Sequence, residues 1–171
     1  STYITNLSLL IRKNLQNAEN LTVSLEEELS RARHYLALEQ LRLKHKFDFQ
    51  IEVGKEVDAQ AWAIPNMVLQ PYLENAIWHG LRYRETKGNL KVHYQKTGNM
   101  LEVIIEDNGI GRTKSQELKT QNQQKKVSTG MHNTEHRVQI INEMFGTKLT
   151  VQVEDTKPTG TRVKLQMELK S

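Results

Sequence analysis

Two short segments constrain the fold of this chain more than any other feature. Leu101, Val103 and Ile105 alternate with other positions and the pattern stops at Asp107, which is typical of a strand. The strand continues into Glu106-Asp-Asn-Gly-Ile-Gly111, a sequence typical of a tight glycine turn. The other segment, Leu69-Gln-Pro-Tyr-Leu-Glu-Asn-Ala-Ile-Trp-His-Gly80, has a helical pattern. The sequence therefore predicts an Asn-bearing helix followed by a strand that ends in a glycine turn.

The composition of the turn favours the binding of a base over that of a phosphate. Gly109 and Gly111 can adopt positive φ and let a ligand approach the backbone closely, because they have no Cβ. Asp107, when ionised, can accept a hydrogen bond from an exocyclic amine such as that of adenine. Asp-Asn-Gly is also a common surface turn, so the turn alone leaves that simpler interpretation open.

The helical segment has two different faces. Tyr72, Asn75 and His79 lie at positions i, i+3 and i+7 and form one polar face. An amide oxygen on such a face suits a magnesium ion that keeps most of its water and its phosphate ligands, so Asn75 is the candidate metal ligand. A polar helix face is usually only solvated, so the assignment depends on the turn as well. The opposite face is apolar and consists of Leu69, Leu73, Ala76, Ile77 and Gly80.

Five blocks in the chain carry a resemblance to a known family. They are Tyr35-Leu-Ala-Leu-Glu39 with Arg42, Ile64-Pro65 leading into Leu69–Gly80, Asp107–Gly111, Ser128-Thr-Gly-Met-His-Asn133 followed by Arg137, and Gly160-Thr161. In this order they resemble sensor histidine kinases of the autolysin-sensor (LytS-like) family. The C-terminal part is similar to the ATPase domain that gyrase, the heat-shock chaperone, histidine kinases and MutL share.

The resemblance implies an ATP-binding catalytic domain of a two-component sensor kinase, with ATP and Mg²⁺ as cofactors. Asp107 would bind adenine and Asn75 would coordinate Mg²⁺, while Gly109 and Gly111 would shape the turn. Glu74 would be an orienting acid at most, because a kinase must protect its phosphoryl group from hydrolysis. The phosphate and lid side would be lined by His79, Gly130, Met131, Asn133 and Thr161.

Two positions depart from the family pattern. Trp78 stands where relatives often have Lys, so one expected phosphate contact is missing, and the indole could stack or pack instead. Ser128 stands where a glycine is common. These departures favour an alternative, in which the domain is a degenerate nucleotide-binding, dimerisation or docking module without kinase activity. A third possibility is an ATPase or serine kinase on the same fold.

None of the six histidines has the sequence context of a family phosphoacceptor. That histidine lies in a His-Phe-(Leu/Ile)-Phe-Asn sequence, upstream of the part that Tyr3–Arg12 resembles. The chain is therefore expected to be a fragment that keeps the catalytic machinery and lacks the group it phosphorylates. The histidines that are present are His34, His45, His79, His93, His132 and His136.

The positive charge of the chain is local. The formal net charge is +4, and residues 112–126 alone hold five basic residues against Glu117, the same excess. The segment Arg112–Ser128 is polar and lacks apolar periodicity, so it is predicted to be a mobile loop in the position of an ATP lid. Its lysines could meet a triphosphate or simply be solvated. A nucleic-acid partner is not expected, because the excess is small, confined and lacks interleaved aromatic residues.

The apolar periodicities predict an α+β fold, a two-layer α/β sandwich preceded by a helical hairpin. Helices are expected at residues 3–17 and 24–45, with Ser24 and Glu27 as a capping box for the second, and at about 65–83 and 131–145. Five strands are expected, starting near Phe47, Leu90, Met100, Leu149 and Val163. The helices would cover one face of the sheet, which is the layout that the family resemblance also implies.

We expect two regions, a C-terminal part of a helical dimerisation region at 1–46 and the ATP-binding domain at 47–171. The apolar stripes of the N-terminal helices should be covered by a second copy, giving a homodimer, with packing on their own domain as the alternative. The resemblance also implies a response regulator as partner. The chain has no Cys and no apolar stretch long enough to span a membrane, so a cytoplasmic portion of a sensor, membrane-bound only through other segments, is expected.

Overall fold

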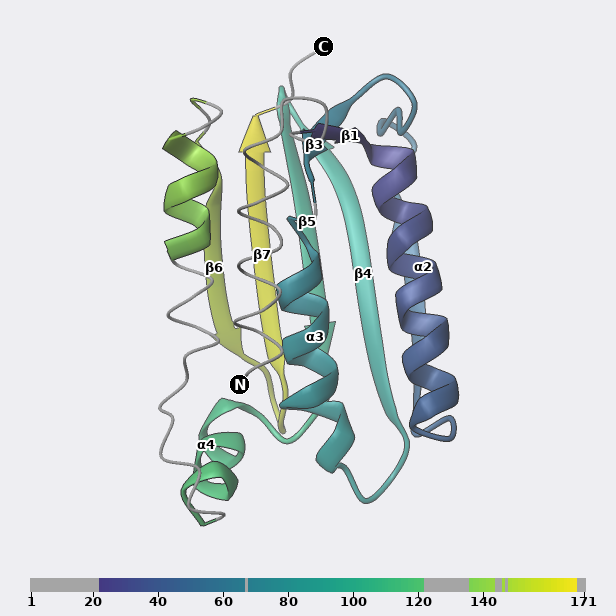
Figure 1. Ribbon diagram of the computed structural model, residues 1–171, viewed down its shortest axis with the longest axis vertical. Helices are drawn as coiled ribbons and strands as arrows, with labels where there is room; N and C mark the ends of the chain where they lie inside the picture. The colour runs from purple at the N-terminus through teal and green to yellow at the C-terminus, as the bar shows by residue number, and fades with distance from the viewer. Residues whose placement is uncertain (1–21, 67, 122–135, 144–145, 147, 169–171) are drawn as a thin grey trace.

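The centre of the molecule is a five-stranded sheet with the order β2-β4-β5-β7-β6 (Figure 1). The computed structural model describes residues 22–66, 68–121, 136–143, 146 and 148–168. The β2 and β4 strands are parallel, and the other neighbours are antiparallel. All five strands expected from apolar alternation are confirmed: β2 (Phe47–Val53), β4 (Gly88–Thr97), β5 (Met100–Asp107), β6 (Thr150–Asp155) and β7 (Thr161–Glu168).

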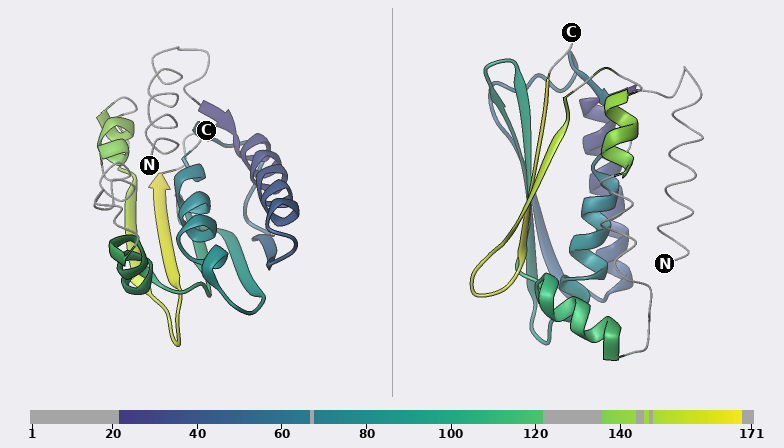
Figure 2. Two further views of the ribbon diagram at one scale, coloured as in Figure 1. Left: turned by 60° about the horizontal axis from the view of Figure 1, so that its bottom comes forward. Right: turned by 90° about the vertical axis from the view of Figure 1, so that its left-hand side faces the viewer.

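Helices cover one face of this sheet and leave the other open, as Figure 2 shows in its right-hand view. The covering layer contains α2 (Leu25–Arg42), α3 (Gln70–Trp78) and a helical segment at residues 136–143. On the open face, polar side chains pair across the strands. Glu102, for example, accepts hydrogen bonds from Gln95 on β4 and Gln166 on β7. The predicted two-layer α+β sandwich is confirmed.

The second predicted helix forms, and it packs on the sheet of its own chain. Ser24 caps α2 by accepting a hydrogen bond from the backbone N–H of Glu27 at 3.1 Å. The apolar side of α2, including Leu29 and Leu36, is buried in the same hydrophobic core as the strands and α3. The expectation that a second copy covers this stripe is therefore wrong for α2, because the stripe is buried within its own chain. The division of the chain at residues 46 and 47 stays a prediction. The first predicted helix and the rest of the hairpin lie outside the described residues.

The alternation of apolar and polar residues does not predict a second, two-stranded sheet, which holds the start of α2. The strands β1 (Thr22–Ser24) and β3 (Ala63–Pro65) pair antiparallel, with Val23 opposite Ile64. The first N–H groups of α2 also find partners there, because Leu25 donates to the carbonyl of Trp62 at 2.9 Å. Strands this short carry too few residues for a period of two to be recognised.

Two other elements differ from the predicted ones. The helix expected at about 65–83 is shorter, because residues 63–65 belong to β3 and the chain continues after α3 as a 3₁₀ turn, η2 (Leu81–Tyr83). The segment expected to be an irregular loop begins with a helix, α4 (Arg112–Gln121). The remainder of that segment lies outside the described residues.

The packing of α2 yields a prediction for stability. Leu36 is fully buried, so Leu36→Ala should lower the free energy of unfolding by about 2–5 kcal/mol, the range for a buried leucine truncated to alanine. Leu38 lies on the outer side of the same helix and is 66% exposed, so Leu38→Ala should change it by less than about 0.5 kcal/mol. Urea unfolding at two protein concentrations measures both effects. A loss that depends on concentration would instead indicate that a second copy covers the Leu36 side.

Candidate functional site

The site is centred on Asp107, the last residue of β5. In the sheet register Asp107 lies between Leu90 of β4 and Thr161 of β7, so it is held from both sides. It is only 5% exposed, and its Oδ1 accepts the backbone N–H of Gly109 at 2.9 Å. Burial raises the pKa of Asp107 to about 7, although hydrogen bonds from the Gly109 and Thr161 backbone lower it again in part. A buried carboxylate of this kind is a strong candidate for ligand recognition.

Two glycines bring the turn and the end of the helical segment into contact. A Cβ on Gly109 would overlap the backbone of Gly80, and a Cβ on Gly80 would lie 2.9 Å from Asp107 Oδ1. The contact is closed by a hydrogen bond from the Ile110 N–H to the Gly80 carbonyl oxygen at 3.3 Å. Gly111 has a φ of +87°, whereas Gly109 is needed for its small size, not for a positive φ. The two segments that the sequence singled out therefore meet at Asp107.

Asn108 fixes the outer side of the turn. Its side-chain oxygen accepts the Asn89 N–H at 2.7 Å, and its own N–H donates to the Asn89 carbonyl oxygen at 3.2 Å. The Arg84 guanidinium donates to the carbonyl oxygen of Asn108 at 2.5 Å. The turn is thus bonded to the start of β4 and to the residues after η2, which makes it rigid before any ligand binds.

The α3 helix carries the predicted metal ligand close to this turn. Asn75 is half-buried, and its side-chain amide has no hydrogen-bond partner among the residues that the structure describes. His79 follows at the end of α3 and is also half-buried. Tyr72, expected on the same polar face, is instead buried, so that face is polar only toward its C-terminal end.

Glu74 lies in a buried ionic cluster. It is 2% exposed and its Oε1 accepts the Gln70 side-chain N–H at 3.2 Å. The guanidinium of Arg137, from the helical segment 136–143, is also buried, and burial lowers its pKa to about 10 against the opposing effects of Tyr72, Glu28 and Glu74. Burial likewise raises the pKa of Tyr72 to about 12. The cluster brings together charged groups from α2, α3 and the 136–143 segment, and it places Glu74 near the positive charge of Arg137.

The remaining predicted residues divide into two groups. Thr161 lies opposite Asp107 at the start of β7. Gly130, Met131 and Asn133 lie outside the described residues, as does the rest of the block Ser128–Asn133. Within the described part of the chain no three His, Asp or Glu side chains gather as a metal site, so a cation would rely on Asn75 and on ligand oxygens.

Sequence reasoning missed two features of the site. One is Gly80, whose backbone is in contact with the turn and which the helical pattern assigned only to the apolar face. The other is the pair of guanidinium groups on Trp78, from Arg42 and Arg82, with Cζ atoms 4.3 Å and 4.8 Å from the ring centroid. In the sequence, Arg42 is part of one family block and Trp78 is a departure within another block. Nothing in the sequence indicates that the two side chains are in contact.

Comparisons with known proteins agree with this geometry. A family model described as histidine kinase matches residues 1–47. Sensor histidine kinase YpdA of Escherichia coli (strain K12) is 30% identical over 139 residues, which are 81% of this chain and 24% of YpdA. Sensor protein LytS of Bacillus cereus is 29% identical over 161 residues, which are 92% of this chain and 26% of LytS. The chain thus spans about a quarter of the length of these relatives.

Solved structures show the same fold. The catalytic domain of histidine kinase ThkA superposes with a TM-score of 0.55 at 15% identity and covers 86% of this chain and 93% of that domain. The Acinetobacter baumannii histidine kinase AdeS gives a TM-score of 0.58 at 13% identity, over 99% of this chain and 77% of that structure. The fold is that of a histidine kinase catalytic domain. In sequence, the chain belongs to the LytS/YpdA-like sensor histidine kinases.

One further finding concerns membranes. Among the residues that the structure describes, no helix is both long and apolar enough to cross a bilayer.

The buried Asp107 predicts an unusual pH dependence of stability. Its pKa is 3.8 in the unfolded chain and about 7 in the folded domain, so between these values the folded state holds a proton that the unfolded state has lost. The free energy of unfolding should therefore fall as pH rises from 4 to 7, by up to about 1.4 kcal/mol per pH unit from this group. Asp107→Asn should flatten this part of the stability curve in urea unfolding.

Asp155→Asn is the matched control for this effect. Asp155 is exposed and its pKa is lowered by a hydrogen bond from Arg112 at 2.8 Å, so its loss should leave the slope between pH 5 and 7 unchanged. If Asp107→Asn and the parent domain lose stability equally over this range, Asp107 is ionised in the folded domain well below pH 7.

Proposed function

We propose that this domain binds ATP and serves as the catalytic domain of a two-component sensor histidine kinase, transferring the γ-phosphoryl group of ATP to a histidine. The observation that carries the proposal is the buried Asp107 carboxylate, held by the sheet and the Gly109 N–H beside the end of α3. A carboxylate in this position costs stability, so ligand recognition is the best explanation for its presence.

The base end of the proposed site is Asp107. Its carboxylate accepts the hydrogen bond of the adenine 6-amino group, and the Gly80–Gly109 contact holds it in position before binding. Guanine carries an oxygen at that position. This oxygen would face the Asp107 carboxylate, and since both groups are acceptors, no hydrogen bond could form. The site therefore favours ATP over GTP.

The phosphate end of the proposed site begins at Asn75. Its half-buried amide is an oxygen ligand of the kind that magnesium accepts, and the fit is good because no described residue occupies that amide. Magnesium supplies charge neutralisation at the phosphates when it is bound. In the proposal this end is completed by His79, Gly130, Met131, Asn133 and Thr161.

Glu74 has a positioning role in this proposal. Its carboxylate belongs to the cluster around the Arg137 guanidinium and so holds α3 against the segment 136–143. A carboxylate committed in this way does not activate water, which suits an enzyme that transfers a phosphoryl group and avoids its hydrolysis.

The acceptor is proposed to be a histidine other than the six in this sequence, because none of them has the expected context. The names of the relatives support a response regulator as partner. Similarity to a solved structure of the cytoplasmic segment of histidine kinase QseC supports a cytoplasmic location. A homodimer is proposed as well. It would use surfaces other than the buried stripe of α2.

The base assignment can be tested by titration calorimetry. Asp107→Asn should weaken ATP binding by about 1.5–3 kcal/mol, the range for a hydrogen bond to a charged group. GTP should bind the parent domain far less well than ATP does. Asp48→Asn is the control, because Asp48 is an exposed residue of β2 that pairs with Lys87 at 3.1 Å. Equal ATP affinity in Asp107→Asn and the parent domain would contradict the assignment.

The metal assignment has a separate test. Asn75→Ala should abolish the magnesium dependence of ATP binding and spare most of the binding of adenosine, because only the phosphate end needs the ion. Asn99→Ala is the control, since Asn99 lies in the turn between β4 and β5. A domain that binds neither ATP nor adenosine would favour the alternative, a docking or dimerisation module that has lost nucleotide binding.

A further inference from the structure

Arg82 lies in η2, directly after α3, and its guanidinium contacts two aromatic rings. Its Cζ lies 4.8 Å from the centroid of the Trp78 ring and 4.5 Å from that of the Tyr83 ring. Its guanidinium also donates a hydrogen bond to the Tyr83 hydroxyl. Its backbone is fixed too, because the Lys46 Nζ donates to the Arg82 carbonyl oxygen at 2.6 Å. Stacking and hydrogen bonding of this kind leave an arginine few alternative positions.

The positive charge of Arg82 is not balanced within the described part of the chain. The second guanidinium on Trp78 belongs to Arg42, which forms an ion pair with Glu39 at 3.2 Å. For Arg82 no carboxylate partner occurs among the described residues. Two guanidinium groups on one indole repel each other, and the Lys46 ammonium adds to this field. An anion bound at Arg82 would relieve this repulsion.

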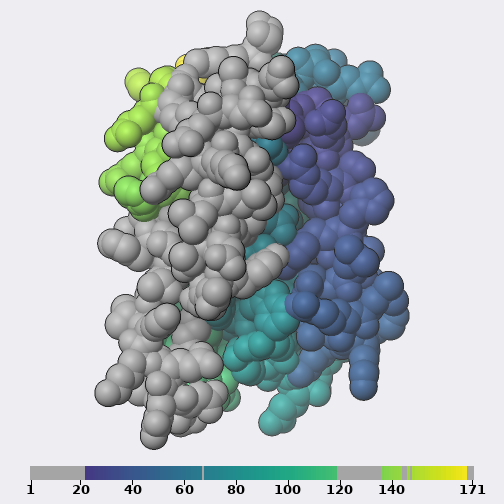
Figure 3. Space-filling view, in the orientation of Figure 1, coloured from purple at the N-terminus to yellow at the C-terminus, as the bar shows by residue number. Residues whose placement is uncertain are grey.

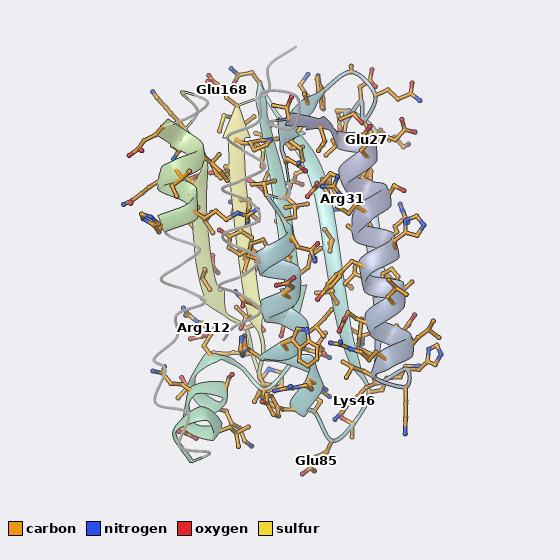
Figure 4. All side chains as sticks on the ribbon, viewed as in Figure 1. Glu27, Arg31, Lys46, Glu85, Arg112 and Glu168 are labelled. Atoms are coloured by element: carbon orange, nitrogen blue, oxygen red, sulfur yellow. The ribbon has the colours of Figure 1, made fainter. Side chains whose placement is uncertain are left out.

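The position of Arg82 relates it to the rest of the site. Trp78 lies three residues after Asn75 on α3, so the two side chains project from the same side of the helix. Gly80, two residues before Arg82, contacts Asp107 and Gly109. Figure 4 labels Lys46 and Arg112, the residue after the glycine turn, and both lie in the lower half of the view. Figure 3 shows the same face with all atoms, coloured by residue number.

We propose that Arg82 is a phosphate-binding residue, with Trp78 as the residue that positions it. The inference rests on the proposed function, and it adds a ligand for the triphosphate to the base ligand Asp107 and the metal ligand Asn75. The guanidinium suits this role because its planar set of N–H donors matches two oxygens of one phosphate. Position 78 carries a tryptophan where relatives often have a lysine. In the proposal Trp78 instead positions Arg82, four residues later, and Arg82 supplies the positive charge.

The test compares nucleotides that differ only in their phosphates. In titration calorimetry with magnesium, Arg82→Gln should weaken ATP binding about tenfold or more, because a charge-assisted hydrogen bond is lost. Adenosine should bind within about twofold of the parent affinity, because it lacks the phosphates. Arg82→Lys keeps the charge and should recover part of the ATP affinity. Arg33→Gln, on the exposed side of α2, should behave as the parent does.

A second readout follows the positioning residue directly. With Trp62→Phe as background, Trp78 is the single tryptophan of the chain, and its fluorescence should change on addition of ATP but not of adenosine. If Arg82→Gln binds ATP as tightly as the parent, or loses ATP and adenosine equally, Arg82 has no specific phosphate role and the proposal is overturned. If the parent binds neither compound, the proposed function fails first and this inference falls with it.

Discussion

The contact between Gly80 and Gly109 is the constraint on which the candidate site depends. Both residues must lack a Cβ. A Cβ on Gly109 would overlap the backbone of Gly80, and a Cβ on Gly80 would crowd the Asp107 carboxylate. The contact forces the end of α3 and the end of β5 together and removes water from Asp107, which is why burial dominates its pKa. The proposed base ligand, the proposed metal ligand and the residues after α3 are thereby placed around one point.

The cost of burying Asp107 is offset by packing elsewhere. The Leu25, Leu29 and Leu36 side chains of α2 join the core beside β2 and α3, so a helix that carries no proposed ligand stabilises the elements that do. The Arg137 and Glu74 cluster has a similar effect at the other side of α3. The α3 helix is therefore supported on both sides, by the core that α2 joins and by the charges around Arg137.

The sequence predicted the strands and the meeting of the two segments, because alternation and turn chemistry are local properties. It failed where the outcome depends on packing partners. The apolar stripe of α2 was visible, but a stripe does not say which surface covers it. The polar α4 has no apolar periodicity to detect, and it begins directly after Gly111. Tyr72 is buried and feels the charge of Arg137, an interaction between residues far apart in the sequence.

The base ligand Asp107, the metal ligand Asn75 and the phosphate ligand Arg82 of the proposals all lie between residues 70 and 111, in one continuous run of α3, η2, β4 and β5. Loop closure within such a run costs little entropy, so these three residues come together without a long intervening loop. It also separates two kinds of evolutionary change. Changes in the base ligand, the metal ligand and Arg82 can be confined to this block, and changes of length or charge can be confined to the segment after Gly111.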